Sequence, residues 1–355
     1  MQPVFKAASR MMVAIVMAGT VLGTTTPAFS QSQALEITVH AAALESNRLG
    51  DPADQKVGLY LPAAYFKEPN RQFATVYFLH GFADTPAKGV AEILKRHMDG
   101  LIAAHKVEPM IVVAPNGLNR FSGSFYTNSA VTGDWESYVT RDVVGYIDAH
   151  YRSIPEAKAR GISGHSMGGY GALMLAFRHP DVFGSVYAMS PAMTVLEGDL
   201  GPSNPVWSRL ATVKTPADLA GLLDHDFFLA VVIGMDAAFA PEPEKAPTFG
   251  LPPFKMEGEQ AVPDPAVLAK FQAKIVSTAI PSMIATISQL KGIYIDYGAE
   301  DPFTHIPLGA RRVSEELSLL GIPNTLEVYE GTHDNQVNRR LDERVLPWLS
   351  ERLQH

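Results

Sequence analysis

The chain has 355 residues with 46% hydrophobic and 19% charged side chains, a composition typical of a globular protein with one large domain or two small ones. Its formal net charge of −8 and the lack of a basic stripe with interleaved aromatic residues make nucleic acid an unexpected partner. The chain contains no cysteine, which excludes disulfides, a thiol nucleophile, cysteine zinc sites and lipid attachment to cysteine.

The N-terminus has the pattern of a secretory signal peptide. Lys6 and Arg10 form a basic start, an apolar run follows over 11–22, and the small residues Ala28 and Ser30 suit a cleavage site after Ser30. The alternative is a membrane anchor, but the apolar run is shorter than the roughly 20 residues that span a bilayer. We therefore expect a secreted or periplasmic protein without a stable membrane anchor.

The remaining residues, 31–355, alternate short apolar runs with helical patterns, which predicts a single domain with a doubly wound, mostly parallel α/β sheet. The runs 35–39 and 57–61 alternate like half-exposed strands, and we expect them to pair with each other. Denser runs are typical of strands that are covered on both faces. These denser strands are expected at 74–79, 110–114, 161–163, 185–189 and 293–297, followed by a last strand at 326–329.

Helical periodicity separates the expected strands. In one helix Trp135, Val139, Val143 and Ile147 share a face at helical spacing. The expected helices are 90–105, 134–151, 168–178, 302–320 and 337–353.

The segment 193–291 interrupts the alternation. It has no clear strand, is rich in proline at 241–247 and 251–253, and has a helical pattern over 266–290 that we expect to break before Pro281. Because long insertions of this kind are often lids, the segment predicts a lid-like helical and loop insertion over the active site. The alternative is a helical insertion without that role.

Ser166 lies in the string Gly164-His165-Ser166-Met167-Gly168, after an expected strand and before an expected helix. This is the context of a nucleophile elbow, where small flanking residues permit a tight turn and the serine side chain projects from the strand end. The alternative is a chance glycine-rich turn. The pattern predicts that Ser166 is a catalytic nucleophile.

A serine nucleophile needs a base, and the base is in turn oriented by an acid. In this type of fold the order along the chain is serine, acid, histidine. His333 follows the last expected strand and is the expected base. The loop after the preceding strand contains Asp301, the favoured acid, and Glu300, its main rival. Asp301 also suits an N-cap, which is its structural alternative.

The oxyanion hole is expected to consist of two backbone N–H groups. One is that of Met167, and the other is that of Phe82, with Gly81 as the rival. Gly81, Trp135 and His165 are candidates for lining the substrate site. The alternative for Trp135 is that it anchors its helix to the sheet.

An apolar acyl pocket could be formed by four residues of the insertion, for which buried packing is an equal alternative. These residues are Met235, Phe239, Phe249 and Phe254.

With these motifs in place, the chain resembles the esterase D family of α/β hydrolases, which includes the mycobacterial antigen 85 acyltransferases and several feruloyl esterases. In that family the acid follows a glycine by three residues, which favours Asp301 after Gly298, and the family's base falls on His333. The matching stretches are 76–81, 109–115, 133–136, 163–172 and 178–183.

The sequence therefore predicts an exported serine carboxylic-ester hydrolase that acts through an acyl-enzyme, with a small-molecule, glycan or lipid ester as substrate and no metal or organic cofactor. One alternative is an acyltransferase of the antigen 85 type, which uses the same residues with a sugar or lipid hydroxyl as acceptor. A remote alternative is a non-catalytic binding protein.

Overall fold

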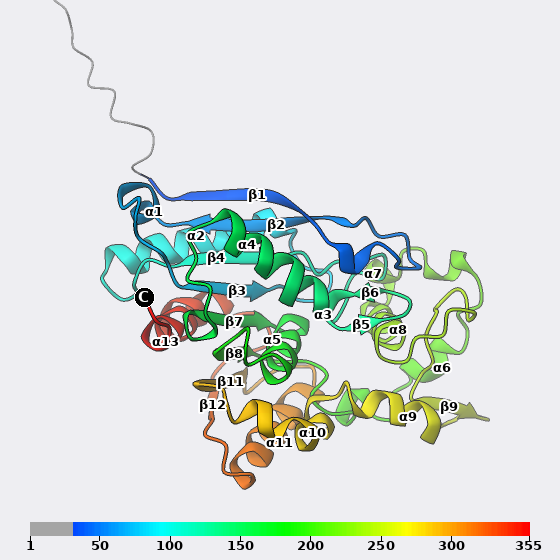
Figure 1. Ribbon diagram of the computed structural model, residues 1–355. Coiled ribbons are helices and arrows are strands. Elements are labelled where there is room, and N and C mark those ends of the chain that lie inside the picture. Colours follow the sequence, from blue (N-terminus) through cyan, green and yellow to red (C-terminus); the bar gives the residue numbers. More distant parts are fainter. Residues whose placement is uncertain (1–30) are drawn as a thin grey trace, which may run out of the picture.

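The computed structural model describes residues 31–355, so the expected signal peptide lies outside the described residues. An eight-stranded sheet forms the centre, in the order β1-β2-β4-β3-β7-β8-β11-β12, seen from top to bottom in Figure 1. Its strands are β1 (Gln33–His40), β2 (Asp54–Leu61), β3 (Thr75–Leu79), β4 (Ile111–Pro115), β7 (Arg160–His165), β8 (Ser185–Met189), β11 (Gly292–Gly298) and β12 (Thr325–Tyr329).

The sheet combines two antiparallel pairings at one edge with parallel strands over the rest. β1 pairs antiparallel with β2, as expected, and β2 pairs antiparallel with β4. The strands from β4 to β12 all run parallel, and β3, β4, β7 and β8 are buried along their whole length. The predicted doubly wound, mostly parallel α/β-hydrolase fold is confirmed.

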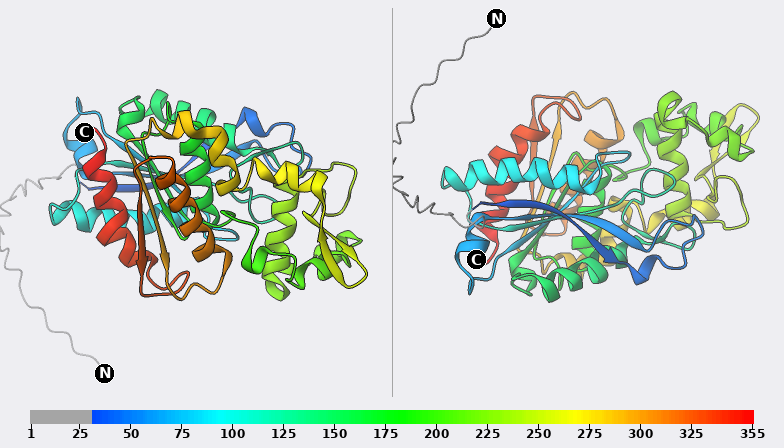
Figure 2. Two further views of the ribbon diagram at one scale, coloured as in Figure 1. Left: turned by 90° about the horizontal axis from the view of Figure 1, so that it is seen from below. Right: turned by 90° about the horizontal axis from the view of Figure 1, so that it is seen from above.

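Helices cover both faces of this sheet. α2 and α13 pack on one face, and α4, α5, α10 and α11 pack on the other; Figure 2, right, shows α2 and α13 opposite α4. The helices are α1 (Ala63–Lys67), α2 (Ala87–Ala103), α3 (Trp135–Ser137), α4 (Val144–His150), α5 (Met167–Arg178), α10 (Val276–Ile287), α11 (His305–Leu319), α12 (Val337–Arg340) and α13 (Leu346–Arg352), with π-helical turns at Tyr138–Val143 and Leu341–Val345.

The insertion contains more regular structure than its sequence suggested. It holds α6 (Val206–Leu210), α7 (Leu222–His225), α8 (Phe227–Phe239), α9 (Pro265–Gln272) and a hairpin of β9 (Phe254–Glu257) and β10 (Gln260–Pro263). A smaller hairpin, β5 (Asn128–Ser129) with β6 (Gly133–Asp134), precedes it in the chain.

The expected break before Pro281 is present, since the chain leaves the helix at 273–275, between α9 and α10, and Pro281 itself lies inside α10. Proline lacks an N–H, so at this position, in the second turn, it removes a single helical hydrogen bond. The C-terminal part of the segment, α10, packs against α5 and α11 on the sheet.

The other elements of the insertion gather at one end of the molecule. Figure 1 shows α6 to α9 and β9 at the end toward which the arrow of β3 points. In open α/β sheets ligands bind outside the carboxyl ends of the strands, so this end of the sheet is where a site is expected. Within the described residues, no helix is both long and apolar enough to cross a membrane.

Candidate active site

Ser166 lies in the sharp turn between β7 and α5, with backbone angles φ 58° and ψ −116°. A positive φ is unfavourable for serine, so the surrounding structure must hold the turn. A Cβ at Gly168 would lie 1.9 Å from the carbonyl oxygen of Leu79, and a Cβ at Gly164 would lie 2.6 Å from the same atom. Glycine is therefore required on both sides of the turn, which presents the Ser166 side chain at the carboxyl end of β7.

The loops that carry Asp301 and His333 follow the neighbouring strands β11 and β12. A Cβ at Gly298 would lie 2.3 Å from the carbonyl oxygen of Gly331, so the two loops meet backbone to backbone. The N–H of Glu300 also donates to Gly331 at 2.9 Å. As a result, Asp301 Oδ2 lies 2.7 Å from His333 Nδ1.

Asp301 is held on both of its oxygens. Its side chain is fully buried, and Oδ1 accepts a hydrogen bond from the N–H of Phe303 at 2.9 Å. Since a carboxylate only accepts, His333 Nδ1 is the donor in the pair. The Phe303 ring packs edge-on against the His333 ring, with centroids 4.9 Å apart. The imidazole is thus fixed with Nε2 as its free nitrogen.

The rival acids occupy other environments. Glu300 is exposed. Asp296 lies inside β11, where its Oδ2 accepts hydrogen bonds from Tyr187 at 2.7 Å and from Arg340 at 2.8 Å. The structure also separates Asp301 from its alternative role, because the N-cap of α11 is Thr304.

His165 lies beneath His333, with ring centroids 4.6 Å apart. Its Nε2 donates to the backbone carbonyl of His333 at 2.9 Å. Burial and the neighbouring His333 lower the pKa of His165 to about 4, so the ring is neutral at neutral pH. His165 therefore borders the pocket and holds the His333 loop.

The loop after β3 is fixed by polar contacts on each side. His80 is almost fully buried; its Nε2 accepts from the N–H of Gly117 and its Nδ1 donates to the carbonyl of Gly81, both at 2.7 Å. Burial lowers the pKa of His80, which keeps this neutral tautomer. The N–H of Gly81 donates a hydrogen bond to Asp84 Oδ2 at 3.1 Å.

Two backbone N–H groups beside Ser166 are open. Those of Phe82 and Met167 have no hydrogen-bond acceptor among residues 31–355. Gly81, the rival to Phe82, is already engaged with Asp84, which leaves Phe82 as the available donor of its loop. Both residues border the same pocket as Ser166.

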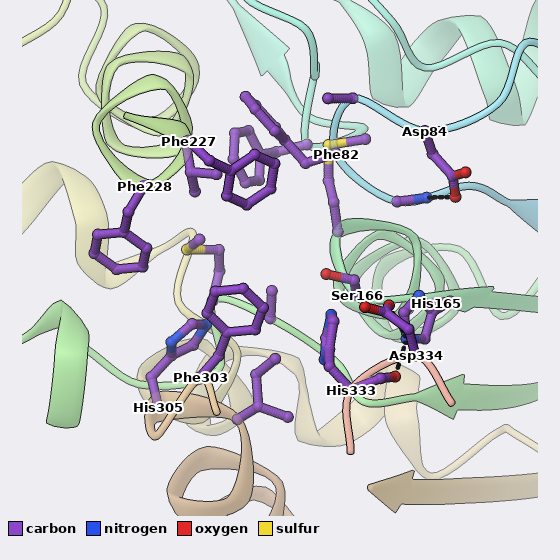
Figure 3. A pocket seen from close by; sticks show the side chains of 18 residues that line it. Phe82, Asp84, His165, Ser166, Phe227, Phe228, Phe303, His305, His333 and Asp334 are labelled. Atoms are coloured by element: carbon purple, nitrogen blue, oxygen red, sulfur yellow. Dashed lines mark hydrogen bonds and ion pairs between the residues drawn. The ribbon is translucent and has the colours of Figure 1, made fainter. Parts of the chain in front are cut away.

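A cavity of about 380 Å³ opens over Ser166. Figure 3 shows Ser166 and His333 on one side of it and the rings of Phe227, Phe228 and Phe303 around the rest. Phe227 and Phe228 belong to α8, so the insertion supplies part of the wall. The cavity is mainly apolar, and Gly81, Phe82, Met167 and His165 also line it.

The other expected lining residues do not reach this cavity. Trp135 is fully buried and donates from Nε1 to the carbonyl of Thr132 at 2.6 Å, so it packs its helix and does not border the cleft. The proposed acyl-pocket residues Met235, Phe239 and Phe254 are buried in the core, and Phe249 lies outside the wall of the cavity.

Several residues of the site were not expected from the sequence. Phe227, Phe228, Phe303 and His305 line the cavity. The sequence carried a signal for Phe303, since it follows Asp301 by two residues, and the others depend on how the insertion folds.

His165, His333 and Asp334 form the one group in the described chain with metal-ligand spacing, their donor atoms lying within 4.8 Å. His165 Nε2 carries the proton donated to a carbonyl and is not free to bind an ion. His333 Nδ1 is likewise taken by Asp301. One nitrogen of each ring is thus already engaged in a hydrogen bond within the protein.

Known proteins resemble the chain over most of its length. A family model, Esterase, described as "Putative esterase", matches residues 46–337. A ferulic acid esterase has a similar structure, with a TM-score of 0.63 and 20% identity over 90% of this chain and 98% of that chain.

Two further structures are similar in fold. An S-formylglutathione hydrolase from Agrobacterium tumefaciens matches with a TM-score of 0.57 and 18% identity, over 92% of this chain and 98% of that chain. FphF, a fluorophosphonate-binding serine hydrolase of Staphylococcus aureus, matches with a TM-score of 0.55 and 18% identity, over 92% and 100%. The family match covers most of the chain, so the chain belongs to the esterase family, as its motifs indicated.

Proposed function

We propose that the protein hydrolyses carboxylic esters through an acyl-enzyme on Ser166, with His333 as base and Asp301 as acid. The observation that supports this most directly is the 2.7 Å contact between Asp301 Oδ2 and His333 Nδ1 beside a serine in a strained elbow. Ser166 and His333 border one cavity. A hydrogen bond between Ser166 and His333 need not be formed in the free enzyme, because catalytic hydrogen bonds are often long there and tighten when substrate binds.

In the proposed reaction the Ser166 oxygen attacks the acyl carbon while His333 Nε2 takes the hydroxyl proton. The N–H groups of Phe82 and Met167 donate to the oxyanion of the tetrahedral intermediate, which typically contributes about 3 kcal/mol per donor. His333 then returns the proton to the leaving alcohol. Water, deprotonated by His333, attacks the acyl-enzyme, and His333 then returns this proton to the Ser166 oxygen as the acid is released. Asp301 keeps the required tautomer and stabilises the imidazolium.

We further propose that the segment 193–291 acts as a lid through α8. Phe227 and Phe228 come from the first turn of this helix and face the cavity. Closing an apolar wall over the reacting ester would exclude water other than the attacking molecule.

Export is the remaining part of the proposal. The sequence of residues 1–30 supports a signal peptide that is removed near Ser30. Edman sequencing of the protein recovered from the medium or periplasm should begin at Gln31; a chain that keeps its first residues would contradict this.

The proposal is tested with Ser166→Ala and the matched variant Ser163→Ala. Ser163 lies on β7, the strand that leads into the Ser166 turn, and its buried hydroxyl has no partner among the described residues. Its removal should therefore leave hydrolysis of p-nitrophenyl acetate unchanged. Ser166→Ala should lower kcat by about 10⁴-fold or more. Retained turnover in Ser166→Ala would exclude the proposed nucleophile.

The same assay separates hydrolase from acyltransferase. Products are analysed with and without an added alcohol or sugar acceptor. Free acid as the main product in both cases supports hydrolysis, whereas predominant transfer to the acceptor would assign the antigen 85-type reaction instead.

A further inference from the structure

A second histidine–aspartate pair borders the same cavity as Ser166. His305, the first residue of α11, lies with Nδ1 2.7 Å from Asp199 Oδ1, and its backbone N–H donates to the same oxygen at 2.8 Å. Its side chain is 4% exposed. In the view of Figure 3, His305 lies on the side of the pocket opposite Ser166.

The pair is held by a close approach of two segments. Asp199 belongs to a short 3-10 helix, Gly198–Leu200, that lies against the start of α11. Gly198 has φ +63°, and a Cβ there would lie 2.6 Å from Thr304 Oγ1. The N–H of Asp199 donates to the same Thr304 oxygen at 2.9 Å. Only glycine lets the Asp199 loop come this near, so the carboxylate is placed by the backbone.

The outer nitrogen of His305 is left without a partner. Its Nε2 is buried and makes no hydrogen bond within residues 31–355. A buried polar atom without a partner is costly, and a ligand bound in the cavity that His305 lines would supply the missing partner. Because Nδ1–H is donated to a carboxylate, the neutral ring presents the Nε2 lone pair as an acceptor.

The residues around His305 indicate which kind of ligand group would donate a hydrogen bond to its Nε2. Phe228, Phe303 and Ile306 line this part of the cavity. Among residues 31–355, no lysine or arginine lines the cavity, and its charged members besides histidine are Asp84 and Asp334. An anionic ligand is therefore disfavoured, and an uncharged hydroxyl on an apolar body fits.

We propose that His305, oriented by Asp199, determines specificity by accepting a hydrogen bond from a hydroxyl on the apolar part of the ester substrate. This rests on the proposed function, because it requires that the ester is bound over Ser166. Asp199 is a positioning residue in this arrangement, and His305 contacts the substrate without reacting.

The test uses two ester series, one with the substituent on the acyl side and one with it on the alcohol side. The first is methyl 3-phenylpropanoate with hydrogen, hydroxyl or methoxy at the 3- or 4-position of the ring; the second is 2-phenylethyl acetate with the same substituents. In at least one series the hydroxyl ester should have a kcat/KM about tenfold above both analogues, the size expected for one hydrogen bond. Methoxy cannot donate, so a methoxy ester equal to the hydroxyl ester would overturn the acceptor role.

Variants of His305 assign the preference to this residue. In His305→Phe the ratio of hydroxyl to unsubstituted ester should fall to about one, whereas His305→Gln, whose amide oxygen can accept, should keep part of it. His97→Phe is the matched control, since His97 pairs with Asp342 at 2.8 Å outside the cavity, and its ratio should equal the parent's. A ratio that persists in His305→Phe, or a parent without hydroxyl preference in either series, would overturn the proposal.

Failure of the two proposals is distinguishable. If Ser166→Ala still hydrolyses every ester, the proposed function fails. If Ser166→Ala is inactive and the parent shows no preference for hydroxyl, only the role of His305 fails. Should His305→Phe not fold, the parent's three-way comparison and His305→Gln still decide the question.

Discussion

His333 can act as a base only while its Nδ1–H is directed at a carboxylate. Asp301 meets this need from a fully buried position 2.7 Å away, whereas Glu300 is exposed. Asp301→Asn should therefore lower kcat for p-nitrophenyl acetate by about 10³–10⁴-fold, because an amide can impose the wrong tautomer. Glu300→Gln should change it by less than about twofold. A larger loss in Glu300→Gln would move the acid role to that residue.

The lowered pKa of His165 has a consequence for stability. The ordinary value is 6.5 and the folded value is about 4. As pH falls from 6.5 toward 4, the unfolded chain gains a proton that the folded chain does not, so stability decreases over this window and levels off below it.

His165→Gln keeps a donor for the His333 carbonyl and cannot titrate. Its melting temperature should therefore fall less between pH 7 and pH 4.5 than that of the parent, as measured by circular dichroism. The quantity to compare is the change in melting temperature with pH, because the substitution can also shift the melting temperature by the same amount at every pH. Parallel curves for the two proteins would show that His165 does not titrate as described.

At the scale of elements, the elbow depends on the contact of α5 with β3. In Gly168→Ala the new methyl group would lie 1.9 Å from the carbonyl oxygen of Leu79, which is backbone and cannot rotate away. The substitution should lower the free energy of unfolding by at least about 2 kcal/mol and reduce esterase activity.

Gly145 gives the matched control for this prediction. It lies in α4, and a Cβ there would meet no atom within 4 Å. Gly145→Ala should raise stability by up to about 1 kcal/mol, because alanine is the better helix former. Urea unfolding of both variants checks the pair, and similar destabilisation by both would contradict the close approach at Gly168.

The central strands and the elbow could be predicted because their signals are local. Dense apolar runs mark β3, β4, β7 and β8, and the glycines around Ser166 mark a turn that no larger residue permits. The hairpin β9–β10 was missed because its residues other than Phe254 are half-buried or exposed and lack the apolar pattern of a core strand. The helical pattern over 266–290 does break before Pro281, but the break lies at 273–275, and Pro281 itself is tolerated inside α10.

Packing between distant segments explains what the sequence could not predict about the site. Trp135 has a side chain suited to a cleft, but its burial depends on the hairpin and helices around it. Conversely, Asp199 and His305 are 106 residues apart, and nothing local marks either as a partner of the other. Ser166, Asp301 and His333 could be proposed from the sequence because each follows a strand of the sheet.

At the scale of the molecule, Arg340 ties the C-terminal helices to the sheet. Its guanidinium donates to Asp296 on β11 at 2.8 Å, to Glu327 on β12 at 2.7 Å and to Tyr187 on β8 at 2.9 Å. Asp296 is fully buried, and burial raises its pKa to about 6 although Arg340 opposes the shift. Without the guanidinium, Asp296 would be left as an uncompensated buried acid.

Arg340→Leu should therefore lower the free energy of unfolding by roughly 3 kcal/mol or more. The neighbouring Arg339 is exposed and pairs with Glu343 at 3.0 Å on the surface, so Arg339→Leu should cost less than about 1 kcal/mol. Denaturant unfolding of both variants measures the difference. Equal losses would show that the buried network does not hold the helices to the sheet.

The central claim is that Ser166 is the nucleophile and that His333 activates it. Intact-mass and peptide mass spectrometry after treatment with a fluorophosphonate measures this directly. The account predicts one adduct per chain, located on Ser166, with labelling absent in Ser166→Ala and slowed by about 10³-fold or more in His333→Ala. An adduct on another residue, or unchanged labelling in Ser166→Ala, would contradict it.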